Sequence, residues 1–343
     1  MIQIFSPTIR RREMDSVLTC MVDEKIGPGD LNTRFVNGIK EFTGCAGAVV
    51  FRNAAIALSY ALKALIFPKE SKIMISSLAP KWQRIALEEL GYSIILLDVD
   101  QYTACVTSET VSKGIEQGGK LLVVSEPFGL IPDMQSILEL GIPIIEDISE
   151  SVGGERNEKK AGSFGVYSIL SLEETDVITA GGGAVLCFNE KKAWEQFAPI
   201  YRKILKIDVL PDLNCALGYV GLKEFRKNEE ARKNIYNLFK NAVMQGRRHK
   251  VFSREEENNF TVHSFPVIVA NGSKEVCKYA DRKEIETKMA FSNSVISDIM
   301  DTEEAAFYPV ASSLYLRTIL MPLYPRLRAS QIEIIAKVLA TLP

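Results

Sequence analysis

The chain has 343 residues, of which 47% are hydrophobic and 24% charged, and its formal net charge is −2. This near-neutral balance gives no electrostatic basis for binding nucleic acid or an anionic membrane surface. No apolar run reaches membrane-spanning length and the first residues lack the apolar stretch of a signal peptide, so we expect a cytoplasmic protein. The six cysteines are scattered without a CxxC pair, which favours reduced thiols over disulfides or a metal site.

The first two thirds of the chain alternate short apolar runs with helical patterns. We expect strands at 48–51, 73–75, 94–97, 121–124 and 142–145, and helices after the first strand and at 82–90, 108–117 and 134–140. Near-continuous apolar strands separated by helices predict a largely parallel sheet that is covered on both faces. Ligands bind beyond the carboxyl ends of such strands, which points to Asn53, Ser77, Glu126 and Asp147.

The last third of the chain begins in a long polar helix, predicted at about 218–245. A strand at 264–269 and a final helix at 330–342 follow. We therefore divide the chain into an N-terminal arm with a large α/β domain, residues 1–240, and a small C-terminal α+β domain, residues 241–343. The basic cluster at 245–250 favours a surface turn over a phosphate site, and His263 favours packing over catalysis.

Three segments carry candidate chemistry. Glu146 and Asp147 end an apolar strand, so alternation places one carboxylate at the ligand-facing edge; otherwise Asp147 caps the next turn or pairs with an arginine. Asn53 precedes a helix that starts directly after a strand, which makes either a phosphate cradle or an N-cap without a ligand. The glycines at 181–183, which precede the apolar run 184–188, permit a ligand to approach the backbone closely. A turn that binds no ligand would have the same sequence.

These segments resemble, in order, the motifs of the DegT/StrS family of nucleotide-sugar aminotransferases along nearly the whole chain. The segment 53–58 stands at the place of the family's Ser-Gly-Thr-x-Ala-Leu phosphate loop. Further matches are Phe128-Gly129, Ile145-Glu146-Asp147, Gly162-Ser163-Phe164-Gly165 and the closing run 320–325. The resemblance implies a fold type I transferase that depends on pyridoxal phosphate, with a mostly parallel seven-stranded sheet and a smaller C-terminal domain. It also implies a homodimer, a nucleotide-sugar ligand and a role in cell-surface polysaccharide biosynthesis.

The resemblance assigns roles to individual positions. Asp147 falls on the aspartate that keeps the pyridine nitrogen of the cofactor protonated, since a nearby carboxylate raises the pKa of that nitrogen. Ser171 falls on a family serine near the cofactor, and Glu150 falls where the family usually has glutamine or histidine. A carboxylate beside the ring oxygen of the cofactor would be repulsive, so Glu150 departs from the pattern.

The catalytic lysine of the family has no counterpart in the expected segment. Counting forward from Gly165 places it at Asp176, whereas counting back from the glycines at 181–183 places it at Thr175. Residues 170–176 contain no lysine in either case, and neither a hydroxyl nor a carboxylate can form a Schiff base.

Other expected cofactor contacts also differ. Ala54 and Ala55 replace the glycine and threonine of the phosphate loop, and Pro80 stands where the family has an aromatic ring over the cofactor. We therefore expect a non-transaminating member, a pseudoenzyme in which pyridoxal phosphate is not covalently bound or is absent. The alternatives are a lysine-independent enzyme of the sugar-dehydratase kind, which needs a histidine at the lysine position, or an active aminotransferase whose motifs align differently.

Overall fold

The computed structural model describes residues 1–254 and 259–343. The larger sheet has seven strands in the order β1-β9-β8-β5-β4-β2-β3. These strands are β1 (Gly47–Phe51), β2 (Lys72–Ser76), β3 (Ser93–Leu97), β4 (Gly119–Ser125), β5 (Ile144–Asp147), β8 (Tyr167–Ser171) and β9 (Ala184–Phe188). Strand β9 runs antiparallel to both of its neighbours, and the other pairs are parallel. The predicted mostly parallel α/β sheet is therefore confirmed.

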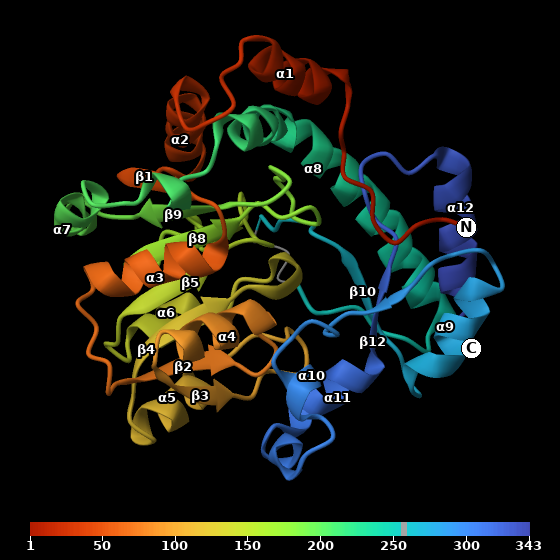
Figure 1. The fold of residues 1–343 in the computed structure, drawn as a ribbon. Helices are drawn as coiled ribbons and strands as arrows, with labels where there is room; N and C mark the ends of the chain where they lie inside the picture. The colour runs from red at the N-terminus through yellow and green to blue at the C-terminus, as the bar shows by residue number, and fades with distance from the viewer. Residues whose placement is uncertain (255–258) are drawn as a thin grey trace.

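Helices cover both faces of this sheet (Figure 1). Neighbouring strand residues point to opposite faces, so that Val50 and Met74 join one core cluster while Phe51 and Ile75 join the other. The second cluster lies under α3 (Ala54–Ala64), α4 (Lys81–Glu89) and α7 (Lys191–Tyr201). The first lies under α2 (Asp30–Thr43), α5 (Ser108–Glu116), α6 (Met134–Leu138) and α8 (Asp212–Gly246). Burial on both faces explains why the strands read as continuous apolar runs.

Helix α8 spans the molecule and connects the large sheet with the C-terminal elements (Figure 1). It packs against α1 (Arg11–Val22), α2 and the last helix, α12 (Ala329–Ala340). A three-stranded sheet in the order β10-β12-β11 follows, formed by β10 (Phe265–Ile268), β12 (Thr318–Met321) and β11 (Lys288–Met289). The remaining elements are the β6–β7 hairpin (Glu155–Arg156 and Lys159–Lys160), α9 (Ser273–Asp281), α10 (Ile296–Ile299) and α11 (Pro309–Arg317).

One carboxylate joins the starts of two helices in this arrangement. Asp212, the first residue of α8, accepts hydrogen bonds from the backbone N–H groups of Gly29, Leu31 and Asn32 at 2.8, 3.0 and 2.8 Å. The first N–H groups of a helix have no partner within the helix. The Asp212 side chain therefore caps α2 from a distant part of the sequence.

Some element boundaries differ from the predicted ones. Helix α8 begins six residues before the predicted start, because Asp212 is fixed by α2. Strand β5 begins at Ile144, since Pro143 before it has no N–H to donate to a neighbouring strand. Strand β8 was absent from the prediction, because its run contains polar residues at both ends. None of the described helices has both the length and the apolar character needed to cross a bilayer.

Candidate functional site

The carboxyl ends of β4, β5 and β8 surround a cavity of about 230 Å³, which we call the strand-edge pocket. These strands end at Ser125, Asp147 and Ser171, and each of the three residues lines the pocket. Its other walls include Pro80, Trp82, Glu126, Phe128, Glu150, Glu173, Thr175, Asp176 and Phe291. The fold thus brings together side chains that lie up to about 210 positions apart in the sequence, from Pro80 to Phe291.

Six of the nine predicted site residues line this pocket: Pro80, Asp147, Glu150, Ser171, Thr175 and Asp176. The other three, Asn53, Ala54 and Ala55, are not among its lining residues. Asn53 is the N-cap of α3, where its side chain accepts a 2.8 Å hydrogen bond from the Ile56 N–H. The backbone of residues 208–210 pairs with the end of β1 directly before this cap. Asn53 is thus an N-cap, a role that fits both alternatives, and the three residues are not among those that line this pocket.

Asp147 is buried and fully engaged by uncharged donors. Its Oδ2 accepts a 2.8 Å hydrogen bond from the Gln83 side-chain amide, and its Oδ1 accepts the backbone N–H and the hydroxyl of Ser149. Burial raises the pKa of Asp147, and the hydrogen bonds from Ser149 and Gln83 oppose that shift. The predicted turn cap at Asp147 is thus present, but an amide takes the place of the predicted arginine.

Thr175 and Asp176 lie between the strand-edge pocket and a smaller adjoining cavity of about 40 Å³. The Asp176 carboxylate accepts a 2.7 Å hydrogen bond from the Glu173 N–H. The residue is partly exposed, yet burial of its carboxyl group raises the pKa to about 8, with hydrogen bonds from Ser171 and Glu173 opposing the shift. At neutral pH the Asp176 side chain is therefore mostly a protonated acid.

Glu126 in the pocket wall and Glu146 beside it are both buried carboxyl groups. Glu146 accepts hydrogen bonds from the backbone N–H groups of Gly162, Phe164 and Gly165, so the Gly-Ser-Phe-Gly motif forms a cradle for this carboxylate. Gly162 has a φ of 85°, and an added Cβ would lie 2.9 Å from Ile148. Burial raises the pKa of Glu146 to about 7, and burial next to Glu146 also raises the pKa of Glu126. The titrations of these two side chains are therefore coupled.

Glu150 reaches the pocket beside a strained turn. Phe128 has a φ of 57°, which is unusual for a residue with a side chain, and its N–H donates to the Glu150 carboxylate. The Arg254 guanidinium donates a 2.6 Å hydrogen bond to the Phe128 carbonyl from the other side. His263 also approaches Glu150, with 3.5 Å between Nδ1 and Oε2, and it lines the small cavity beside Asp176. Folding brings His263 next to the site from a distant segment, and the preference for packing over catalysis stays a prediction.

No lysine or arginine is found among the described residues that line the strand-edge pocket, whereas five carboxyl groups are: Glu126, Asp147, Glu150, Glu173 and Asp176. Lys81 lies between two lining residues in the sequence, but its ammonium group pairs with Asp298. Lys160, which precedes the Gly162 motif, donates a 2.8 Å hydrogen bond to the Phe42 carbonyl. The described part of the chain also contains no group of three potential metal ligands.

The sequence matches the model of the DegT/DnrJ/EryC1/StrS aminotransferase family over residues 7–340. Among curated proteins it is 24% identical over 351 residues to GDP-perosamine synthase of Escherichia coli O157:H7, covering 96% of this chain and 95% of that protein. The match therefore extends over both sheets and all segments of the site.

Solved structures share the fold. The aminotransferase TlmJ from Streptoalloteichus hindustanus superposes with a TM-score of 0.88 at 18% identity, covering 99% of this chain and 98% of that chain. Spr1654 from Streptococcus pneumoniae, in its PLP-form, gives a TM-score of 0.88 at 15% identity, covering 98% of this chain and 96% of that chain. At such low identities these similarities establish the architecture alone. The chemistry of the site has to be argued from the residues of this chain.

Proposed function

The chain belongs to the DegT/DnrJ/EryC1/StrS aminotransferase family, and from this premise we propose that it keeps the family fold without catalysing transamination. In this proposal the protein acts in nucleotide-sugar metabolism as a binding or accessory protein, most simply as a homodimer. The observation that carries the proposal is the lining of the strand-edge pocket, which has carboxyl groups and no amine among the described residues.

Pyridoxal phosphate, the cofactor that the family implies, does not fit the residues of this pocket. The cofactor is an anion through its phosphate group, and no lysine or arginine among the described lining residues would pair with that charge. The cavity of about 230 Å³ is also smaller than the roughly 300–1,000 Å³ of typical ligand pockets. The Asp147 carboxylate, which would have to face the pyridine nitrogen, is already held by Gln83 and Ser149.

The phosphate loop gives independent support. Ala54 and Ala55 have no side-chain donor, and Asn53 uses its side-chain oxygen on the first turn of its own helix. Each hydrogen bond to a charged acceptor contributes roughly 1.5–3 kcal/mol. Loss of two such bonds together with the covalent link would weaken cofactor binding by several orders of magnitude.

One observation favours a second candidate function, a lysine-independent enzyme. His263 lines the small cavity together with Thr175 and Asp176, so an imidazole lies near the place of the missing amine. A histidine at this place could move a proton that the lysine moves in relatives. Its Nδ1 has no hydrogen-bond partner in the described structure, apart from the 3.5 Å approach to Glu150.

Borohydride reduction separates these functions. The purified chain is incubated with pyridoxal phosphate, reduced, and analysed by intact mass and peptide mapping, with Spr1654 as the positive control. We expect no stoichiometric adduct at any single lysine and no retained cofactor. Light scattering follows whether the chain is a dimer, as proposed. A stoichiometric adduct at one lysine would refute the proposal. Cofactor that is retained but not fixed by borohydride would instead support the lysine-independent enzyme.

A further inference from the structure

Another cavity, of about 720 Å³, lies beside the C-terminal turns of α8. We call it the basic groove. It is bordered by the loop at 101–102, the last turns of α8, the segment 249–254 and α11. The basic cluster at 245–250 contributes His249 and Lys250 to its wall.

Among the described residues, the charges that line the groove are all of one sign. Lys240, Lys250, Arg254 and Arg317 line it, and no aspartate or glutamate occurs among its described lining residues. These cations come from separate elements, so the groove is more than the surface turn that the sequence cluster favours. Three or four like charges around one concavity repel one another, and a bound anion removes that repulsion.

Three of these cations keep donors free for a ligand. The ammonium groups of Lys240 and Lys250 make no ion pair or side-chain hydrogen bond with the described residues. Arg317 donates through Nε to the Val269 carbonyl at 2.9 Å, which leaves its two terminal nitrogens. Arg254 differs, since its donors are directed to Phe128, Gly129 and Tyr236 and it contributes mainly its charge.

An aromatic wall separates the groove from the strand-edge pocket. Phe252 lines the groove and stacks on Phe128 with 5.4 Å between ring centroids, and Phe128 contacts Phe291 at 5.3 Å. Phe128 and Phe291 line the strand-edge pocket. Tyr102, which is 55% exposed, adds an accessible ring to the groove, and such rings stack on nucleobases.

We infer that the basic groove binds the diphosphate group of a small anionic ligand through Lys240, Lys250 and Arg317. Lysine binds phosphate as a point charge, and arginine adds paired N–H donors. Inorganic diphosphate and a nucleoside diphosphate share this chemistry, and the base of the latter would lie against Tyr102. The inference does not rest on the proposed function, because it concerns a separate cavity.

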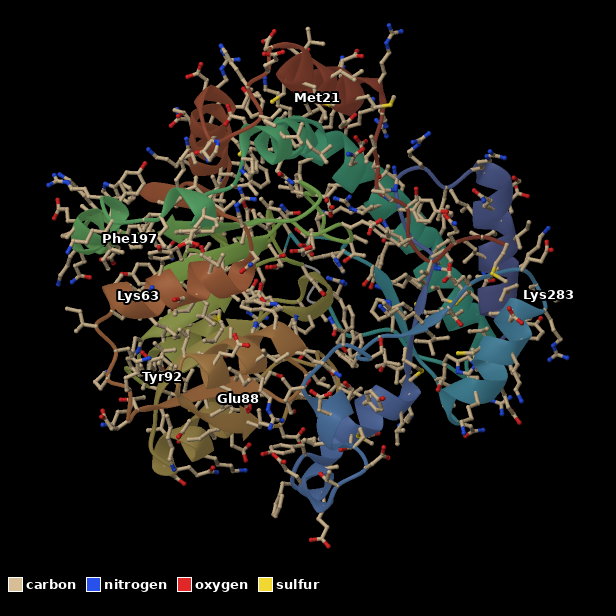
Figure 2. All side chains as sticks on the ribbon, viewed as in Figure 1. Met21, Lys63, Glu88, Tyr92, Phe197 and Lys283 are labelled. Atoms are coloured by element: carbon tan, nitrogen blue, oxygen red, sulfur yellow. The ribbon has the colours of Figure 1, made fainter. Side chains whose placement is uncertain are left out.

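Calorimetric titration tests this inference. The full chain is used, so that Glu255–Glu257, which lie outside the described residues, are present. The probes are inorganic pyrophosphate, GDP and guanosine. The variant is Lys240→Gln/Lys250→Gln, and the matched control is Lys63→Gln/Lys192→Gln, which removes the same charge from α3 and α7. Lys63 (Figure 2) and helix α7 (Figure 1) lie well away from α11, which borders the groove.

We expect pyrophosphate and GDP to bind, with affinity reduced at least about tenfold by the groove variant and within about twofold by the control. A nucleotide ligand is indicated if GDP binds more tightly than pyrophosphate and Tyr102→Leu removes the difference. Equal affinities indicate free diphosphate. The inference is overturned if neither anion binds, or if both variants weaken binding equally while their unfolding midpoints match the parent chain.

Discussion

Gln83 donates a 2.8 Å hydrogen bond from its side-chain amide to the carboxylate of Asp147, and both residues are buried. The same amide nitrogen also donates to the Ser125 hydroxyl at 3.0 Å. Gln83 lies on α4 and Asp147 ends β5, so this bond joins a covering helix to the edge of the sheet. The carboxylate that the family directs toward its cofactor is therefore satisfied within the protein itself.

Removal of this amide should destabilise the fold. Gln83→Ala leaves the buried Asp147 with only the Ser149 donors, and loss of a hydrogen bond to a charged group costs about 1–3 kcal/mol. We expect the free energy of unfolding in urea to fall by that amount. Gln135→Ala, at an exposed position of α6, provides the control and should change it by less than about 0.5 kcal/mol. Equal effects of the two substitutions would show that the Gln83–Asp147 bond contributes nothing specific.

The raised pKa of Asp176 predicts a pH dependence of stability. The carboxyl group has a folded-state pKa of about 8, against about 3.9 when unfolded, so the folded chain holds a proton that the unfolded chain releases. The stabilisation is fully present below pH about 4 and is lost as the pH rises through about 8. Asp176→Asn should therefore reduce the fall in unfolding free energy between pH about 6 and about 9.

The exposed Asp23→Asn substitution removes the same charge and should leave that pH profile unchanged. Glu126 and Asp147 also have raised pKa values, so a reduced slope in Asp176→Asn, and not its complete loss, is the expected result. A profile identical to that of the parent chain would contradict the assignment of the proton to Asp176.

Restoring a lysine at one position should not restore amino transfer. Neither Thr175→Lys nor Asp176→Lys supplies the missing phosphate donors at 54–55 or frees Asp147 from Gln83. Each variant is incubated with pyridoxal phosphate and an amino donor, L-glutamate or L-glutamine, and conversion of the cofactor is followed by absorbance. Measurable conversion in either single variant would show that the missing phosphate donors and the Gln83–Asp147 bond do not prevent amino transfer.

Asp212 should contribute strongly to stability because it caps α2 from outside. Asp212→Ala removes the acceptor for three backbone N–H groups, and we expect a loss of about 2–4 kcal/mol in unfolding free energy. Asp30→Ala, in the exposed first turn of the same helix, should cost no more than about 0.5–1 kcal/mol through the helix dipole. Similar losses in both variants would argue against a special role for Asp212.

Much of the large sheet could be predicted, because strands buried on both faces leave an unbroken apolar signal. The predicted runs at 48–51 and 73–75 lie within β1 and β2, and 94–97 lies within β3. The start of α8 could not be predicted, since the cap between Asp212 and α2 depends on residues about 180 positions away. The division into domains at residue 240 remains a prediction.

Site residues could be predicted where they lie at the end of a predicted strand. They could not be predicted where segments distant in the sequence meet. Asp147 follows from its place at a predicted strand end, whereas Ser171 came from the resemblance to the family, and both line the pocket. Gln83 and His263 were missed, because neither the bond to Asp147 nor the approach to Glu150 has a local sequence signal. Asn53 was proposed for the site because an N-cap after a strand has the same sequence whether or not a ligand is bound.

A crystal structure of the chain after soaking in pyridoxal phosphate tests the central claim most directly. The account predicts that the amide of Gln83 still donates to Asp147 and that no coenzyme density fills the strand-edge pocket. Density for a pyridine ring against Asp147, with a side-chain nitrogen joined to the aldehyde carbon of the coenzyme, would contradict it.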